Sequence, residues 1–362
     1  MPENNRKNNS AFIAERLNNV LDLRFDICTC PACKKNMLER ILSRLPAEFT
    51  DIPPQELSAL SHQIKIEHQN TFTRAISLSI DETSNDPPHE IKENRNKTLR
   101  SIMDRILQER SLDLRHYHIE ILKRRMALRI RANQLNSYAA YLEFLTRNPA
   151  EYDKLFETMC INVSEFFRDP PVWVTIRYLL ENLIRIKNKN GENTLRIWSA
   201  GCANGEEPFS LAIMIAELFG KNLKNFSIHI QATDVDRACL NFAQKACYPK
   251  KSLVNINPGQ LNRYFQDRNN QEYQLRQEIK DMVAYSYLDL TSDINLKDID
   301  LITCRNVFIY FDLKLQEDIL GKFHKCLRLP GYLVLGKTEN LASRMTGEFE
   351  EVDASARIYL KK

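Results

Sequence analysis

The sequence predicts an α/β fold whose C-terminal half contains a parallel sheet covered by helices on both faces. From about residue 167 onward, short apolar strand-like runs alternate with helical runs, which is the pattern of parallel sheets. The first of these runs leads into a glycine turn and a helix start, the arrangement that holds nucleotide-like ligands at the carboxyl end of a strand. Before residue 167, the apolar residues have helical spacing instead.

The composition is that of a globular protein with two or three domains. The 362 residues are 43% hydrophobic and 27% charged, and the formal net charge of +4 does not indicate a nucleic-acid partner. No apolar run approaches the roughly 20 residues of a membrane span, and the polar N-terminus lacks a signal-peptide core. We therefore expect a cytoplasmic protein without membrane insertion. Six of the nine cysteines are scattered singly, which is typical of reduced, buried thiols.

The first unit is expected over residues 11–86, after a polar segment, residues 1–10, that we expect to be disordered. A polar stretch with a Pro-Pro pair, residues 81–97, is typical of a linker, which we place at 87–98. Apolar residues at helical spacing predict three helices before it, marked by Phe12, Ile13, Leu17, Val20 and Leu21, by Met37, Leu38, Ile41, Leu42 and Leu45, and by Phe72, Ile76 and Ile80.

Between the first two of these helices lies a cysteine cluster, Cys28, Cys30 and Cys33. Thiolates at this spacing suit zinc, but three ligands are one fewer than a closed site requires. Either His62, His68 or another chain supplies the fourth ligand, or the cluster is a reduced turn that packs two helices. The sequence leaves both interpretations open.

Residues 99–166 are predicted to be helical throughout. Ile119, Leu122, Met126 and Ile130 form an apolar stripe, and basic residues occupy the other sides of the same helix. A solvated face is the ordinary interpretation of such a charge run, and docking of an acidic partner is the alternative. The candidate docking residues are Arg124, Arg125, Arg129 and Arg131.

The α/β region has five strand-like runs, with helices such as 210–219 and 313–327 between most of them. Pro249, Pro258 and a polar loop interrupt this alternation and predict a small inserted subdomain at 248–285, while residues 352–362 fit a terminal antiparallel strand. The strand-like runs are residues 195–200, 228–233, 283–287, 300–304 and 332–337.

The turn after the first strand predicts the character of the ligand. Gly201 and Gly205 form the turn, and Glu206 and Glu207 follow where a phosphate cradle would carry donors. Acids here indicate a ligand with positive charge and hydroxyl groups, not a pyrophosphate. Asp234, at the tip of the next strand, is placed to accept hydrogen bonds from ribose hydroxyls, although acids at strand ends are also common without a ligand.

Five segments, in order INVSEFFRDP, WSAGCANGEEPFS, ATDVD, ITCRNVFIYFD and GYLVLGKTEN, resemble the CheR family over residues 99–362. Members of this family are S-adenosyl-L-methionine (SAM)-dependent methyltransferases that esterify glutamate side chains of bacterial chemoreceptors. The resemblance implies a Rossmann-like SAM methyltransferase domain at 167–362, with its β-subdomain at 248–285, preceded by the all-α CheR N-terminal domain at 99–166. The implied cofactor is SAM, and the implied product is S-adenosyl-L-homocysteine.

The same resemblance assigns roles to individual residues. Arg168 and Tyr310 match residues implicated in catalysis. The turn sequence CANGEE departs from the Ser-Thr that many relatives carry before Gly-Glu-Glu, but both glycines remain. The residues that match cofactor-binding positions are Asn162, Ser164, Arg168, Gly201, Glu206, Asp234, Asp289, Leu290, Asn306 and Val307.

The implied reaction is displacement of the sulfonium methyl group by a glutamate carboxylate. That carboxylate is already ionised near neutral pH, so no general base is needed, and none of the five segments contains a histidine. Arg168 is suited to hold the carboxylate through its fork of donors, and the Tyr310 hydroxyl to orient it. Without the resemblance, Tyr310 would be assigned to the core and Arg168 to the surface. The alternative function is a SAM-binding signalling scaffold without methyl transfer.

The implied partners are the acidic methylation helices of methyl-accepting chemotaxis receptors. In some family members a glycine-rich loop of the β-subdomain binds a receptor pentapeptide. The corresponding segment here, YFQDRNNQEYQLRQE, contains no glycine and resembles the pentapeptide-independent class.

Residues 11–89 resemble the ComFB family, in the pieces CTCPAC, SRLPAEF and FTRAISLSIDETSNDPPH. This implies an additional, mainly helical regulatory or dimerisation domain, and hence a homodimer. Some ComFB-like proteins are cyclic dinucleotide receptors, so we expect a second messenger such as c-di-GMP to tune methylation. Lys34, Lys35, Arg40 and Arg44 are the candidate phosphate contacts.

Overall fold

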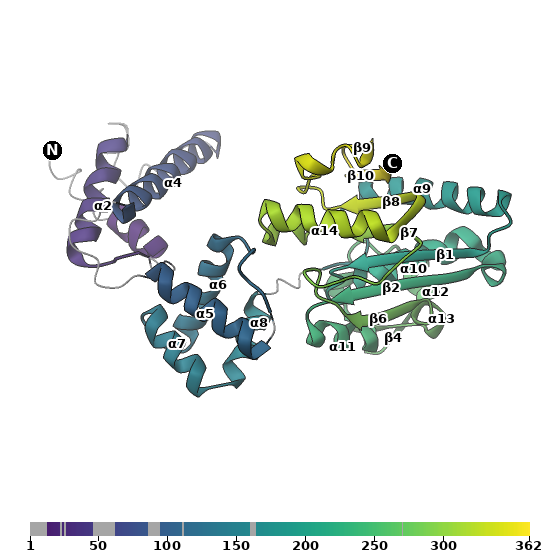
Figure 1. Cartoon of the computed structure of the whole chain (residues 1–362), viewed down its shortest axis with the longest axis horizontal. Helices are drawn as coiled ribbons and strands as arrows, with labels where there is room; N and C mark the ends of the chain where they lie inside the picture. The colour runs from purple at the N-terminus through teal and green to yellow at the C-terminus, as the bar shows by residue number, and fades with distance from the viewer. Residues whose placement is uncertain are drawn as a thin grey trace. The chain divides into compact units, whose positions relative to one another are not determined.

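The computed structural model describes residues 13–21, 24, 27–45, 62–85, 95–110, 112–159, 164–269 and 271–362. The chain forms two compact units, one of Met1–Arg115 with Ile119–Met159 and one of His116–His118 with Cys160–Lys362 (Figure 1). The predicted disorder of residues 1–10 lies outside the described residues. Among the described helices, none combines the length and apolar character that a membrane crossing requires.

The N-terminal part of the first unit is helical, as predicted. A helix over residues 13–21 packs with α2 (Pro31–Arg44) and α4 (His62–Asn85). Cys30 caps α2, because its sulfur accepts a hydrogen bond from the Cys33 N–H at 3.4 Å, and Pro31 suits the first turn. The small core between these helices contains Ile13, Leu17, Leu21, Cys33, Met37, Ile41, Ile76 and Ile80.

The polar stretch at 81–97 is helical at both ends, and the linker placed at 87–98 therefore ends too late. Residues 81–85 continue α4, because Glu82 binds both Arg40 and Arg44 of α2 and the buried Thr83 hydroxyl donates to Asn36 at 2.9 Å. Polar contacts between the two helices therefore outweigh the polar composition of the segment. At the other end, residues 95–98 already belong to the next helix, α5 (Arg95–Arg110).

Four helices account for most of the remaining described residues of the first unit: α5, α6 (Ile119–Ala132), α7 (Tyr138–Arg147) and α8 (Ala150–Met159). The prediction of helix throughout is wrong for residues 112–118 and 133–137, which connect these helices. Leu122, Met126 and Ile130 are buried as expected, whereas Ile119 at the start of α6 is 43% exposed. The predicted boundary at 166 is wrong, because Phe166 packs into the core of the second unit.

The second unit contains a seven-stranded sheet in the order β6-β2-β1-β7-β8-β10-β9, which can be followed in Figure 1. The first five strands pair in parallel, and β10 pairs antiparallel with both β8 and β9, as the sequence predicted for the chain end. The strands are β1 (Thr194–Ala200), β2 (Ser227–Asp234), β6 (Val283–Tyr287), β7 (Ile299–Cys304), β8 (Leu327–Leu335), β9 (Phe349–Asp353) and β10 (Ile358–Lys361).

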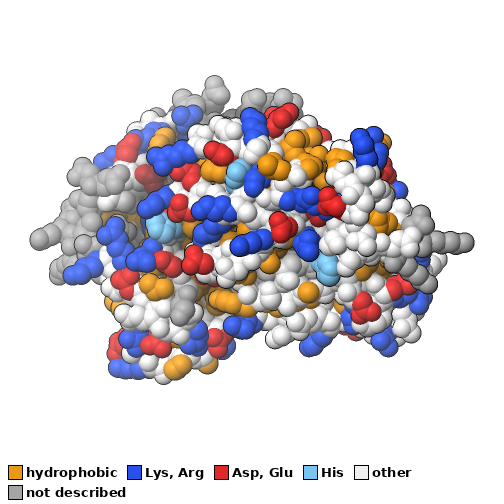
Figure 2. Space-filling view, turned by 45° about the vertical axis from the view of Figure 1, so that its right-hand side comes forward, with side chains coloured by type: hydrophobic (Ala, Val, Ile, Leu, Met, Phe, Trp, Pro, Cys, Tyr) orange, Lys and Arg blue, Asp and Glu red, His pale blue; other side chains and the backbone are white. Residues whose placement is uncertain are grey.

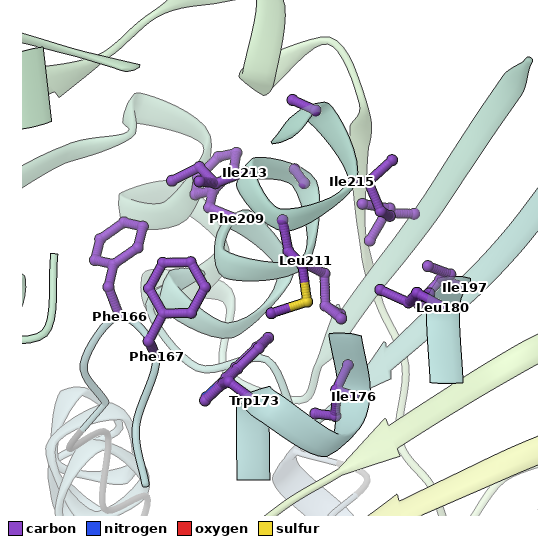
Figure 3. Close-up of a cluster of buried hydrophobic side chains, with 14 of the residues drawn as sticks. Phe166, Phe167, Trp173, Ile176, Leu180, Ile197, Phe209, Leu211, Ile213 and Ile215 are labelled. Atoms are coloured by element: carbon purple, nitrogen blue, oxygen red, sulfur yellow. The ribbon is translucent and has the colours of Figure 1, made fainter. Parts of the chain in front are cut away.

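Two hydrophobic clusters line the faces of this sheet, because successive residues of a strand point to opposite sides. Ile197 belongs to one cluster and Trp198 to the other. In the second cluster the Trp198 ring packs edge-on against the Phe323 ring, with ring centroids 5.0 Å apart. Figure 3 shows the first cluster around the helix that carries Phe209 and Leu211. The helices are α9 (Pro170–Lys189) and α10 (Glu206–Phe219) in the first cluster, α14 (Leu313–Cys326) in the second, α11 (Arg237–Lys245) after β2, and the 3-10 turns η2 (Gly220–Asn225), η4 (Phe308–Tyr310) and η5 (Ser343–Met345).

The inserted β-subdomain is a three-stranded antiparallel sheet in the order β3-β5-β4. Its predicted end at residue 285 is wrong, because Val283–Tyr285 pair with β2 in the main sheet. Its elements are β3 (Cys247–Pro249), η3 (Lys250–Leu253), α12 (Pro258–Tyr264), β4 (Phe265–Asp267), β5 (Glu272–Leu275) and α13 (Gln277–Lys280).

An ion network ties the sheet together near the start of β1 and β7. The buried Lys187 lies 2.8 Å from Asp300 and 3.3 Å from Glu192, and Arg328 lies 2.5 Å from Glu192. Hydrogen bonds from Arg328 and Lys187 lower the pKa of Glu192 from 4.5 to about 2, against the opposing effect of burial.

Glu192→Gln should therefore make stability less dependent on acid pH. A folded-state pKa below the unfolded value contributes stability above pH 4.5 that is lost as pH falls towards 2. Above pH 5 we expect the free energy of unfolding of wild type to exceed that of the variant by about 1 kcal/mol, a modest value because the Glu192–Arg328 pair is partly exposed. This difference should disappear as the pH falls from 4.5 to 2. Thermal melts across this pH range measure it, with the exposed Glu350→Gln as control. A pH-independent gap would contradict the assignment.

Candidate functional site

Four of the residues predicted to bind a ligand lie at the ends of strands that run in parallel, and therefore at one edge of the sheet. Gly201 follows β1, Asp234 ends β2, Asp289 follows β6 and Asn306 follows β7. Contacts join these segments: Asp234 accepts a hydrogen bond from the Ala203 N–H at 2.8 Å, and its carbonyl accepts one from the Leu288 N–H at 3.1 Å.

The glycine turn is packed so closely that larger residues do not fit. Gly201 has φ +75°, and a Cβ there would lie 2.5 Å from the Val307 side chain. Gly205 has φ +89°, and a Cβ there would lie 2.6 Å from the Tyr285 hydroxyl and 3.0 Å from the Tyr248 hydroxyl. Both positions thus require glycine for their conformation and for the close approach. The turn is held against the segment after β7 on one side and against β3 and β6 on the other.

The two acids after the turn have different roles. Glu206 is 2% exposed and accepts hydrogen bonds from the Ser164 and Ser252 hydroxyls, and burial raises its pKa. Its Oε2 is buried and has no hydrogen-bond partner among the described residues, so it has acceptor capacity for a ligand. Glu207 instead accepts from Ser199 at 2.8 Å and Thr303 at 2.6 Å, bridging β1 and β7. The expectation that acids of this turn face a ligand is therefore wrong for Glu207, and for Glu206 it stays a prediction.

The loop that carries Arg168 is held on both sides of this residue. Phe167 and Asp169 have left-handed φ values of 50° and 59°, and the Phe167 N–H donates to Ser210 on α10 at 2.9 Å. The Arg168 carbonyl accepts from Trp173 at 2.8 Å and from Arg305 at 3.1 Å. Its backbone is thus fixed, while its side chain is only half-buried. Asn162 lies outside the described residues.

A buried carboxylate that the sequence analysis did not select, Glu339, holds the segment after β7. Its Oε2 accepts from the N–H groups of Asn306 at 2.9 Å and Gly336 at 2.6 Å. Its Oε1 accepts from Phe308 at 2.7 Å and Ile309 at 3.3 Å. Glu339 therefore sets the backbone of Asn306 and of η4, which ends at Tyr310. Its position directly after β8, in the segment GYLVLGKTEN, was the available signal.

Two further basic residues with a positioning role were also missed. The buried Arg305 binds Asp169 at 2.7 Å in addition to the Arg168 carbonyl, so it ties the Arg168 loop to the end of β7. Lys322 of α14 donates to the carbonyls of Leu290, Thr291 and Ser292 at 2.8–3.0 Å. The Asp289 carboxylate is partly occupied within this turn, where it accepts from the Thr291 N–H at 2.8 Å.

Of the predicted docking arginines, Arg129 has an internal role. It binds Glu151 of α8 through two hydrogen bonds of 2.8 Å, and Tyr141 and Asn133 complete the partners of this buried carboxylate. The docking assignment is wrong for Arg129, because moving it would leave a buried charge uncompensated. Arg124 and Arg131 are exposed and Arg125 is half-buried. Figure 2 shows basic and acidic side chains interspersed on the visible face of the molecule.

In the N-terminal part of the first unit, residues 11–86, which we call the N-terminal unit, the three cysteines lie close together. The Sγ atoms of Cys28, Cys30 and Cys33 lie within 4.8 Å of one another. A hydrogen bond from the Cys33 backbone lowers the pKa of Cys30 to about 7, whereas burial raises the pKa of Cys33 to about 12. The side chains of His62 and His68 lie outside the described residues.

The predicted phosphate contacts of this unit are wrong for Arg40 and Arg44, because Glu82 occupies both guanidinium groups. Lys34 donates to Asn18 at 2.8 Å, and the exposed Lys35 lies 3.9 Å from Glu39.

A mostly parallel sheet with an antiparallel terminal strand, and with a glycine turn and acidic residues at its carboxyl edge, defines a Rossmann-like methyltransferase fold. Residues 162–358 match the family described as CheR methyltransferase, SAM binding domain, and residues 97–160 match CheR methyltransferase, all-alpha domain. The chain therefore belongs to the CheR methyltransferase family.

Proteins of known sequence support this membership. The chain is 31% identical over 257 residues to a chemotaxis protein methyltransferase of Salmonella typhimurium, covering 69% of this chain and 85% of the relative. It is 30% identical over 271 residues to a putative methyltransferase, Cher3, of Pseudomonas putida, covering 73% of this chain and 96% of the relative. A chemotaxis protein methyltransferase of Borreliella burgdorferi is 29% identical over 234 residues, covering 63% of this chain and 83% of the relative.

Glu339→Gln should weaken cofactor binding and stability together. The amide nitrogen cannot accept, so backbone N–H groups lose their acceptor, at a cost of about 1–3 kcal/mol. We expect the dissociation constant of S-adenosyl-L-homocysteine to rise about tenfold, because Asn306 is no longer held. Calorimetric titration and thermal melts measure both effects, with Glu348→Gln, whose side chain is 55% exposed, as control. Unchanged affinity would show that Glu339 does not position the site.

Proposed function

We propose that this protein is a protein-glutamate O-methyltransferase that transfers a methyl group from SAM to glutamate side chains of methyl-accepting chemotaxis receptors. The observation that carries the proposal is a buried oxygen of Glu206 that has no hydrogen-bond partner among the described residues. It lies beside the glycine turn, at the sheet edge that also holds Asp234 and Asn306. Family membership and the chemotaxis methyltransferases among the relatives support the receptor substrate.

The chemistry of these residues fits SAM. The Glu206 oxygen suits the cofactor's ammonium group, and a cation there would oppose the rise in pKa that burial causes. Asp234 accepts the backbone N–H groups of Ala203 and Asp236 on different oxygens, and because a carboxylate offers about four acceptor sites, ribose hydroxyls suit it as further donors. Ser164, Arg168, Gly201, Asp289, Leu290, Asn306 and Val307, together with Asn162, are the other proposed contacts.

When bound, SAM supplies a sulfonium methyl group that a glutamate oxygen takes up as the S–C bond breaks, leaving a glutamyl methyl ester and S-adenosyl-L-homocysteine. The protein's task is alignment, since an ionised carboxylate needs no base. Arg168 presents its guanidinium from a fixed backbone and orients the incoming carboxylate. Tyr310, which η4 positions, orients the reacting glutamate oxygen through its hydroxyl group.

The substrate helix is proposed to dock on α6 through Arg124, Arg125 and Arg131. We further propose that receptors are methylated without a pentapeptide tether, because the connection between β4 and β5 is short and contains no glycine. Tight calorimetric binding of a receptor C-terminal pentapeptide would contradict the second statement.

The N-terminal unit is proposed to regulate this activity, through homodimerisation and a cyclic dinucleotide such as c-di-GMP. With Arg40 and Arg44 occupied by Glu82, Lys34 and Lys35 remain as candidate phosphate contacts, and zinc at the cysteine cluster also stays a prediction. Titration of the full chain with c-di-GMP, a mass measurement in solution and metal analysis decide these three points.

Incubation with radiolabelled SAM and receptor membranes tests the proposed activity, because a glutamyl ester loses its label in base.

Arg168→Ala should lower the rate of methyl transfer about a hundredfold or more, since the carboxylate is no longer held, while the backbone contacts of residue 168 keep the fold. Arg177→Ala, on the exposed face of α9, is the matched control. A scaffold without methyl transfer would leave no base-labile label in wild type, and near-normal turnover would remove Arg168 from the mechanism.

Reversing charge on α6 should weaken receptor recognition. The double variant Arg124→Glu with Arg125→Glu should raise KM for receptor about tenfold without changing SAM affinity, because like charges would then face an acidic helix. The double variant Arg100→Glu with Arg147→Glu has the same net charge and exposed positions on α5 and α7, and serves as control. Equal KM values for the two double variants would show that α6 is only a scaffold.

A further inference from the structure

A three-residue segment between α5 and α6 pairs with the chain around Tyr310. Although α5 and α6 belong to the first unit, His116–His118 belongs to the second. Its middle residue, Tyr117, forms an antiparallel bridge with Phe311. We call His116–His118 the strap.

Two backbone hydrogen bonds fasten the strap on either side of this bridge. The His118 N–H donates to the Tyr310 carbonyl at 2.8 Å, and the Asp312 N–H donates to the His116 carbonyl at 2.8 Å. The strap therefore pairs with the backbone of Tyr310–Asp312 as a short added strand would.

Side chains reinforce the pairing. The Tyr117 ring meets the buried Phe311 ring edge-on, with centroids 5.1 Å apart. His116 Nδ1 lies 3.1 Å from Asp312 Oδ2, and the other oxygen of Asp312 caps α14 by accepting from the Leu315 N–H at 2.8 Å. The imidazole of His118, by contrast, is exposed.

Tyr310 is thus held from two directions by different groups. Glu339 accepts from the N–H groups of Phe308 and Ile309, which precede Tyr310, and also from that of Asn306. The strap contacts the carbonyl of Tyr310 and the two residues that follow it. Glu339 holds Asn306 as well as η4, whereas the two backbone hydrogen bonds of the strap are made with Tyr310 and Asp312.

We propose that the strap positions Tyr310 for methyl transfer, with the His118 N–H as the contact that fixes its backbone. This rests on the proposed role of Tyr310 in the reaction. Because Ile119, the first residue of α6, follows His118 directly, the helix proposed to dock the receptor is continuous with the segment that positions Tyr310. The strap should therefore affect the catalytic step and leave SAM binding unchanged.

Two substitutions of one residue isolate the backbone hydrogen bond. His118→Pro removes the N–H donor, and proline is tolerated at the start of a helix such as α6. His118→Ala removes the same exposed imidazole and keeps the N–H. We expect kcat for receptor methylation to be about tenfold or more lower in His118→Pro than in His118→Ala. Affinity for S-adenosyl-L-homocysteine and the melting temperature are measured on both, and we expect the affinities to agree within about twofold.

A second pair keeps the test decisive if His118→Pro fails to fold. Tyr117→Ala removes the ring that packs on Phe311 and should lower kcat, whereas Tyr117→Phe keeps the ring and should restore it. Equal kcat for His118→Pro and His118→Ala, or for the Tyr117 pair, would overturn the strap proposal while leaving the methyltransferase assignment intact. Absence of methyl transfer in wild type would instead overturn the proposed function.

Discussion

The parallel pairing of β6, β2, β1 and β7 is the constraint on which the candidate site depends. Parallel strands end at the same edge, so segments that are up to about a hundred residues apart in sequence emerge side by side. The register of β1 with β2 and β7 brings the glycine turn against Asp234 on one side and Val307 on the other. Without the parallel pairing of these strands, the glycine turn, Asp234 and Val307 would lie in separate loops and would not form one site.

Buried carboxylates then fix the loops that follow the strands. A buried charge is costly unless it is hydrogen-bonded, and Glu207 and Glu339 are satisfied by hydroxyls and backbone N–H groups of neighbouring strands and turns. Glu206 has one oxygen without such a partner among the described residues. Acids of similar appearance in the sequence are therefore distinguished by their neighbours alone, since some are satisfied within the fold and Glu206 retains acceptor capacity.

Several expectations from the sequence failed for a common physical reason. Arg129, Arg40 and Arg44 were assigned to partners because they are basic and helical, yet each is occupied by a carboxylate distant in sequence, Glu151 or Glu82. Residues 81–85 belong to a polar stretch that is typical of a linker, yet they continue α4 through contacts with α2. Glu339, Arg305 and the strap were missed because their roles depend on contacts with residues distant in sequence, backbone groups among them, which no local side-chain pattern reveals.

The α/β class, the five parallel strands of the main sheet and the family follow from the sequence alone, because hydrophobic periodicity and the five ordered segments are local properties of the chain. The sequence also located the glycine turn, since two positive φ angles in so tight a turn require glycine. Only the tertiary structure decided which charged groups are available to a ligand and which are used by the fold. That decision depends on pairing between residues far apart in sequence, as the partners of Glu207, Glu339, Arg129 and Tyr310 show.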